Sequence, residues 1–82
     1  MSLPKIKFSS LNRTNLGFPS EWKTTLEDGT AVRFHFRQGR LKLFLNEQQK
    51  LETSKDEWDI SGYLSDEDLY ALMAKHEILD EN

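Results

Sequence analysis

The chain of 82 residues contains no cysteine, only two prolines and four glycines, and no long apolar run. Because there is no cysteine, a disulfide framework and a thiolate metal site of the zinc-finger type are excluded, and a reducing compartment is favoured. No segment approaches the roughly 20 apolar residues of a transmembrane helix, and the first residues lack the apolar run of a signal peptide. The sequence therefore predicts a soluble, cytoplasmic protein that is not bound to a membrane.

The residue groups that enzymes use are also scarce. The chain has no thiol nucleophile, no glycine-rich phosphate loop and only two histidines, His35 and His76. A chain of this length forms one small domain, predicted here to span residues 1–82, and it offers little concave surface for a shielded active site. We therefore predict a non-catalytic protein that needs no cofactor and no metal ion.

Charge, in contrast, is plentiful and unevenly distributed. Residues 1–51 contain nine Lys or Arg and four Asp or Glu, whereas residues 52–82 contain two Lys or Arg and ten Asp or Glu. The formal net charge of −3 therefore combines a basic N-terminal part with an acidic C-terminal part. Several of the basic residues recur at every second position, so they are expected on one face of a sheet.

Three segments in the middle of the chain alternate apolar and polar residues, which indicates β-strands with one buried face. They span residues 21–26, 32–37 and 40–45. The glycine-containing turns Asp28-Gly29 and Gln38-Gly39 separate them, and this arrangement predicts an antiparallel β-meander.

The segments around this meander have weaker patterns. One or two additional short strands are expected at residues 4–11 and 58–60. Residues 12–19 are rich in turn-forming residues and are predicted to form a loop. Residues 46–57 are polar and favour no single element.

The apolar pattern also selects the register of the meander. Cross-strand neighbours must point to the same face, and a slip of one residue would expose the apolar set. A two-residue turn at the second glycine and a three-residue turn at the first satisfy this rule, because they place Phe36 opposite Leu41 and Trp22 opposite Phe34. Gly29 is then expected to have a positive φ angle.

A C-terminal helix is predicted to cover the apolar face of the sheet. Ser65 is a suitable N-cap with Asp68 three residues later, and negative charge in the first turn suits the helix dipole. An apolar stripe follows, formed by Leu69, Leu72, Met73 and His76. The predicted fold class is α+β: a β-meander of three clear strands and one or two weaker ones, with one C-terminal helix packed on its apolar face.

The opposite face of the predicted sheet is basic and is the first candidate binding surface. Its cations suit a phosphate backbone, and its aromatic residue suits stacking on a base. The candidate residues are Arg33, His35, Arg37, Arg40, Lys42 and Phe44. Two other interpretations remain open: a solvated face that discourages edge pairing, and a face that the acidic part of the chain partly covers.

Residues 57–68 resemble the calcium-binding loop of EF-hand proteins. Oxygen-bearing side chains stand at loop positions one, three, five, nine and twelve, glycine stands at position six, and a predicted helix follows. The segment departs from the pattern at both ends, where Glu57 stands in place of Asp and Asp68 in place of Glu. The resemblance covers 12 of 82 residues and implies calcium binding as a further alternative.

The acidic segment 52–68 is the third candidate surface. Its carboxylates surround Trp58 and Tyr63, and complementary charge with aromatic anchors suits a basic protein partner. Trp58 itself is expected in the core, because large aromatic side chains are mostly buried. We predict an interaction module that acts through a protein partner or self-association, with nucleic-acid binding by the basic sheet face as the alternative.

Overall fold

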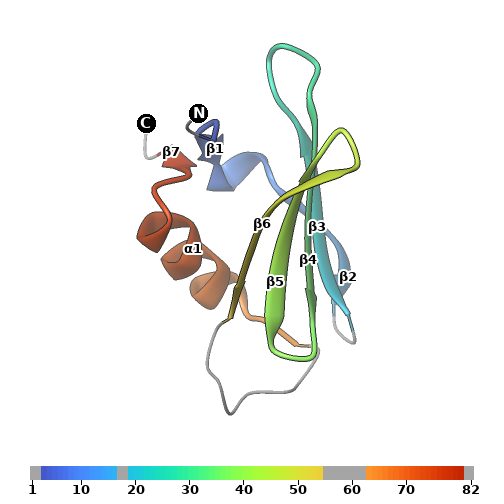
Figure 1. The fold of residues 1–82 in the computed structure, drawn as a ribbon, viewed down its shortest axis with the longest axis vertical. Coiled ribbons are helices and arrows are strands. Elements are labelled where there is room, and N and C mark those ends of the chain that lie inside the picture. Colours follow the sequence, from blue (N-terminus) through green and yellow to red (C-terminus); the bar gives the residue numbers. More distant parts are fainter. Residues whose placement is uncertain (1–2, 17–18, 55–62, 81–82) are drawn as a thin grey trace.

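A computed structural model describes residues 3–16, 19–54 and 63–80 and contains a five-stranded antiparallel sheet (Figure 1). Each strand of this sheet pairs with the next strand along the chain. Its strands are β2 (Asn12–Leu16), β3 (Ser20–Thr25), β4 (Ala31–Arg37), β5 (Arg40–Leu45) and β6 (Gln48–Ser54). The predicted α+β fold with a meander sheet and one helix near the C-terminus is confirmed.

The remaining elements lie on one side of the sheet. They are β1 (Ile6–Lys7), the 3₁₀ helix η1 (Phe8–Ser10), the helix α1 (Asp66–Lys75) and β7 (Leu79–Asp80). The strands β1 and β7 form a separate parallel pair, in which Ile6 lies opposite Leu79. The strand expected over residues 4–11 is therefore only two residues long.

Two further strands differ from the sequence-based prediction. The loop predicted over residues 12–19 is wrong for Asn12–Leu16, which pair with β3 as the edge strand β2. Residues 46–57, for which the sequence favoured no single element, contain the opposite edge strand, β6. Both are polar because an edge strand of this sheet places few side chains in the core, so their apolar periodicity is weak. The strand expected at residues 58–60 lies outside the described residues.

The register predicted for the meander is confirmed. Trp22 lies opposite Phe34 across β3 and β4, and Phe36 lies opposite Leu41 across β4 and β5. The first turn has three residues, because the Leu26 backbone N–H donates to the Thr30 carbonyl at 2.9 Å. Its glycine has a φ of +90°, which agrees with the glycine bulge that this turn requires.

The β4–β5 and β5–β6 turns each place two successive residues at positive φ. Gln38 and Gly39 have φ angles of 52° and 78°, and Asn46 and Glu47 have φ angles of 50° and 66°. Such paired left-handed residues form the tight turns whose twist matches that of antiparallel strands. The Asn46 carboxamide oxygen also accepts from the Ala31 backbone N–H at 2.9 Å. A Glu in a left-handed turn is uncommon, so the sequence did not indicate this second turn.

The start of α1 agrees with the prediction. The Ser65 hydroxyl accepts from the Asp68 backbone N–H at 3.1 Å, and Leu64 and Leu69 are both fully buried on either side of this cap. The helix ends at Lys75, and the imidazole Nε2 of His76 lies 2.8 Å from the Thr53 hydroxyl of β6. The C-terminal end of the helix is thus attached to the sheet.

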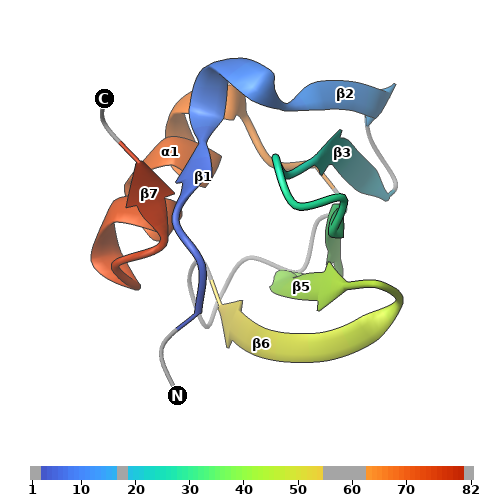
Figure 2. The ribbon, with the colours of Figure 1, turned by 90° about the horizontal axis from the view of Figure 1, so that it is seen from above.

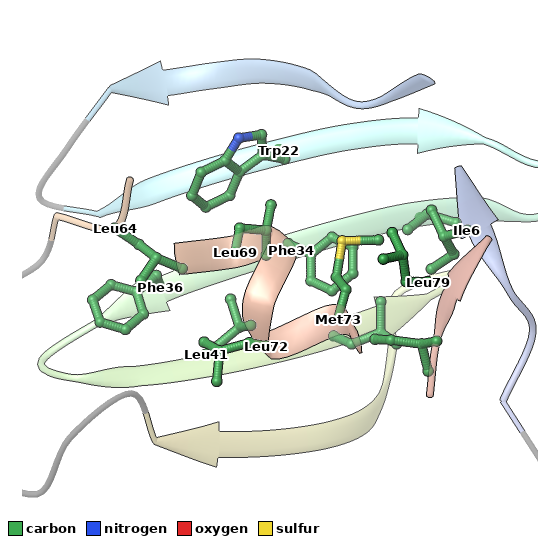
Figure 3. Packing of buried hydrophobic residues seen from close by; sticks show 13 residues of the cluster. Ile6, Trp22, Phe34, Phe36, Leu41, Leu64, Leu69, Leu72, Met73 and Leu79 are labelled. Atoms are coloured by element: carbon green, nitrogen blue, oxygen red, sulfur yellow. The ribbon is translucent and has the colours of Figure 1, made fainter. Parts of the chain in front are cut away.

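The core lies between the concave face of the sheet and α1. Seen from above, the strands from β2 to β6 curve around the space that α1, β1 and β7 occupy (Figure 2). One cluster of buried side chains fills it (Figure 3). Its members are Ile6, Trp22, Val32, Phe34, Phe36, Leu41, Leu43, Leu64, Leu69, Leu72, Met73, Ile78 and Leu79. Across the described ranges, no helix combines the length and hydropathy needed to cross a membrane.

Candidate functional site

The six residues predicted for the basic face all lie on the outer face of β4 and β5, away from the core. The register pairs them directly across the two strands: Arg33 with Phe44, His35 with Lys42, and Arg37 with Arg40. Side chains opposite each other in an antiparallel pair are in contact range, so the fold brings these residues together. The contacts that they make divide them into two groups.

The first group centres on Arg33, whose charge is compensated. Its guanidinium lies 4.1 Å from the centroid of the Phe44 ring. Its Nη1 is 3.4 Å from a carboxylate oxygen of Glu21, and its Nη2 is 3.1 Å from a carboxylate oxygen of Glu47. One face of the Phe44 ring is therefore covered, and the Arg33 charge is shared between two carboxylates.

The second group forms a shallow basic depression at the turn between β4 and β5. We call it the cationic hollow and define it by His35, Arg37, Arg40 and Lys42; with Gln38 they line a volume of about 420 Å³. Arg40 lies 3.5 Å from Glu52 of β6. Among residues 3–16, 19–54 and 63–80, no carboxylate lies within ion-pair distance of Arg37 or Lys42.

The cationic hollow contains two cross-strand pairs of basic residues. Arg37 lies opposite Arg40, and His35 lies opposite Lys42. The like charges of Arg37 and Arg40 in directly opposed positions destabilise the antiparallel pair by about 0.2–1 kcal/mol. The core on the other face of the sheet does not need these charges, so folding alone does not explain their arrangement.

His35 is the one imidazole among the side chains that line the hollow. Partial burial lowers the pKa of His35 from its ordinary value, and the nearby cations Arg33, Lys42 and Arg37 lower it further. Glu21, which lies opposite His35 on β3, acts in the other direction. The net effect is a lowered pKa, which favours a neutral imidazole.

This lowered pKa predicts a pH dependence of stability. The unfolded chain, in which the His35 pKa is about 6.5, binds the proton more readily than the folded chain. The contribution of His35 to stability is therefore complete above about pH 6.5 and is lost as the pH falls through the folded pKa. We expect urea unfolding to show a steeper loss of stability between about pH 7 and 5 in the parent than in His35→Gln. Equal slopes in the two proteins would contradict this assignment.

A second polar network, which sequence reasoning missed, connects β2 and β3 to the start of α1. The Arg13 side chain is only 15 % exposed and contacts Asp66 through Nη1 at 3.0 Å. Its Nη2 donates to the Leu64 carbonyl at 2.7 Å and to the Ser20 hydroxyl at 3.3 Å. The Trp22 Nε1–H donates to the same Asp66 oxygen at 3.0 Å. A single arginine in a segment predicted to be a loop carried no signal for this network.

The acidic candidates are only partly described. Residues 57–62 of the EF-hand-like loop, with Trp58, lie outside the described residues, so calcium binding stays a prediction. Ser65 serves as the helix cap, and no group of three His, Asp or Glu side chains in the described ranges is placed to hold a metal ion. Of the acidic part that is described, Glu52 contacts the cationic hollow, whereas α1 lies on the opposite face of the sheet.

Comparisons with protein-family models, curated proteins and solved structures find no match to this chain.

Proposed function

We propose that this chain is a non-catalytic interaction module that binds an acidic segment of a protein partner in the cationic hollow. The supporting observation is the like-charge pair of Arg37 and Arg40, which lie opposite each other on the outer face of β4 and β5 and line the hollow together with Lys42. Departures from local folding rules tend to occur where a surface serves a function. A carboxylate bound between these side chains would remove the repulsion and supply charge-assisted hydrogen bonds.

The dimensions and charges of the surface favour a short acidic peptide over a nucleic acid. The basic side chains are concentrated around one depression of about 420 Å³ at the β4–β5 turn and do not extend along the sheet as a row of phosphate contacts would. The aromatic ring suited to base stacking has Arg33 over one of its faces.

The substitution Arg37→Glu tests this proposal, because it is expected to have opposite effects on binding and stability. Opposite Arg40, the new carboxylate converts a repulsive pair into an attractive one, so stability should rise by about 0.5 kcal/mol. Amide NMR shifts at low salt measure binding of a short Glu-rich peptide. The variant should lose this binding, and binding to the parent should weaken as the salt concentration increases.

Lys50→Glu provides the matched control, since Lys50 is an exposed cation on β6 that does not line the hollow. It makes the same charge change and should leave peptide binding nearly intact. Equal losses in both variants would show a general effect of net charge and would contradict the proposed site. Stronger shifts with a single-stranded oligonucleotide than with the peptide would favour nucleic-acid binding instead.

A further inference from the structure

A second surface, formed by α1, η1 and β2, gathers the exposed aromatic side chains. Tyr63 and Tyr70 are the two large hydrophobic side chains that stand exposed in the described part of the chain, at 46 % and 43 %. The Tyr70 ring packs edge-on against Phe8, with 5.4 Å between the ring centroids. The Tyr63 ring lies 5.0 Å from the guanidinium carbon of Arg13. Both tyrosines thus contact residues that line one common depression.

This depression is small and is lined by two aromatic side chains together with aliphatic, polar and charged ones. Its volume is about 230 Å³, sufficient for one large side chain of a partner. Phe8, Ser9, Leu11, Arg13, Trp22 and Asp66 line it. We call this depression, with Tyr63 and Tyr70 beside it, the aromatic hollow. Tyr, Trp and Arg are the residue types that most often dominate the binding energy of protein interfaces.

The side chains of the aromatic hollow are held in position before any partner binds. Arg13 is fixed by its contacts to Leu64 and Asp66, and Trp22 by the hydrogen bond from its Nε1–H to Asp66. The Phe8 ring restrains that of Tyr70. Side chains that are already ordered lose little conformational entropy on binding, so this surface can bind a peptide at a low entropic cost.

The charge beside the aromatic hollow determines the kind of partner. Asp66 compensates Arg13 through one oxygen, yet its side chain is 60 % exposed and available to a second cation. Glu67 is exposed next to it and contributes a further negative charge. A basic residue of a partner therefore complements this edge of the surface, and an apolar neighbour complements the aromatic lining.

We propose that the aromatic hollow binds a peptide segment in which a large apolar side chain lies next to Lys or Arg. The apolar side chain would enter the depression between Phe8 and Trp22, and the basic side chain would contact Asp66 and Glu67. The site is separate from the cationic hollow and prefers a peptide of the opposite charge. The chain would then present two interaction surfaces, one for an acidic and one for a basic segment.

The test is an amide NMR titration of the full chain with a peptide of alternating Lys and Leu, compared with one of alternating Lys and Ser. We expect the Leu peptide to shift the Tyr63, Asp66 and Tyr70 amides and to bind about tenfold more tightly than the Ser peptide. Tyr70→Ser should weaken Leu-peptide binding about tenfold, and Glu67→Lys about threefold without removing any packing. Glu27→Lys, the same change in the exposed β3–β4 turn, should leave the affinity unchanged.

Three results would overturn the proposal. Equal affinity for the two peptides would show that the aromatic lining is not used. Equal weakening by Glu67→Lys and Glu27→Lys would show a response to net charge alone. Shifts of the Tyr63 and Tyr70 amides on raising the protein concentration without peptide would assign the surface to a second copy of the chain. Arg37→Glu is expected to leave Leu-peptide binding intact. The test can therefore contradict the proposal for the aromatic hollow without contradicting the proposal for the cationic hollow, and the reverse.

Discussion

Replacing Phe34 with alanine is expected to lower the free energy of unfolding by about 3–5 kcal/mol. Phe34 is fully buried on β4, the central strand of the sheet, where its neighbours across the strands are Trp22 and Leu43. Its ring projects from the sheet toward α1 (Figure 3). Removing the ring takes away its apolar burial and leaves a cavity that the surrounding sheet and helix can only partly close.

A loss of this size is a large part of the total stability. At about 0.05–0.15 kcal/mol per residue, a chain of this length is stabilised by roughly 4–12 kcal/mol. Urea unfolding followed by far-UV circular dichroism measures the change, because the midpoint shifts while the slope stays constant if the transition remains two-state. At the lower end of the stability range, Phe34→Ala leaves a protein that is substantially unfolded at 37 °C.

Phe44→Ala is the matched control for this experiment. Phe44 is the same residue type on the neighbouring strand, but it lies half-buried on the outer face under Arg33. Its replacement removes mainly a cation–π contact and should lower stability by about 1 kcal/mol. Similar losses in Phe34→Ala and Phe44→Ala would contradict the assignment of the core to the concave face of the sheet.

Replacing Arg13 with methionine is expected to lower the free energy of unfolding by about 2–4 kcal/mol. Methionine keeps much of the apolar stem but removes the hydrogen bonds to the Leu64 carbonyl and the Ser20 hydroxyl and the ion pair with Asp66. The Leu64 carbonyl then loses a charged donor at a position where water has little access. The exposed Asp66 carboxylate can regain water, which keeps the loss below that of a fully buried ion pair.

The effect should be concentrated where β2 and β3 meet the start of α1. Amide hydrogen exchange of Leu64 and Leu69 should accelerate more than exchange in the centre of the sheet, because the contact that ties the helix entry to β2 is lost. Arg40→Met is the control, since Arg40 is 65 % exposed and forms one ion pair at 3.5 Å. It should change stability by less than about 0.5 kcal/mol. A comparable loss in both variants would contradict the structural role of Arg13.

The elements that the sequence predicted well are those governed by local rules. The residues around Gln38-Gly39 admit one register that buries both Phe36 and Leu41, and the structure has that register. Ser65 is followed by Asp68 and an apolar stripe, which identify the helix and its first residue. In each case neighbouring residues contain the necessary information, because a turn or a cap involves only a few consecutive positions.

The elements that the sequence did not predict depend on distant partners. β2 is polar and rich in turn-forming residues, and it is a strand because β3 offers it backbone hydrogen bonds. The pair β1 and β7 consists of two residues from each end of the chain, too short for any periodicity. Arg13 has no local sign of its role, since its partners Leu64 and Asp66 lie about 50 residues later in the chain.

The candidate surfaces show the same division. Sequence alone determined that the basic residues of β4 and β5 share the outer face, because side chains alternate along a strand and the apolar set must be buried. Which of these charges pair with a carboxylate of the described residues was decided by the tertiary structure, since Glu47 reaches Arg33 from the β5–β6 turn and Glu52 reaches Arg40 from β6. The aromatic hollow is likewise a tertiary feature: Phe8, Trp22 and Tyr70 are far apart in sequence, and only the packing of η1, β3 and α1 brings them to one surface.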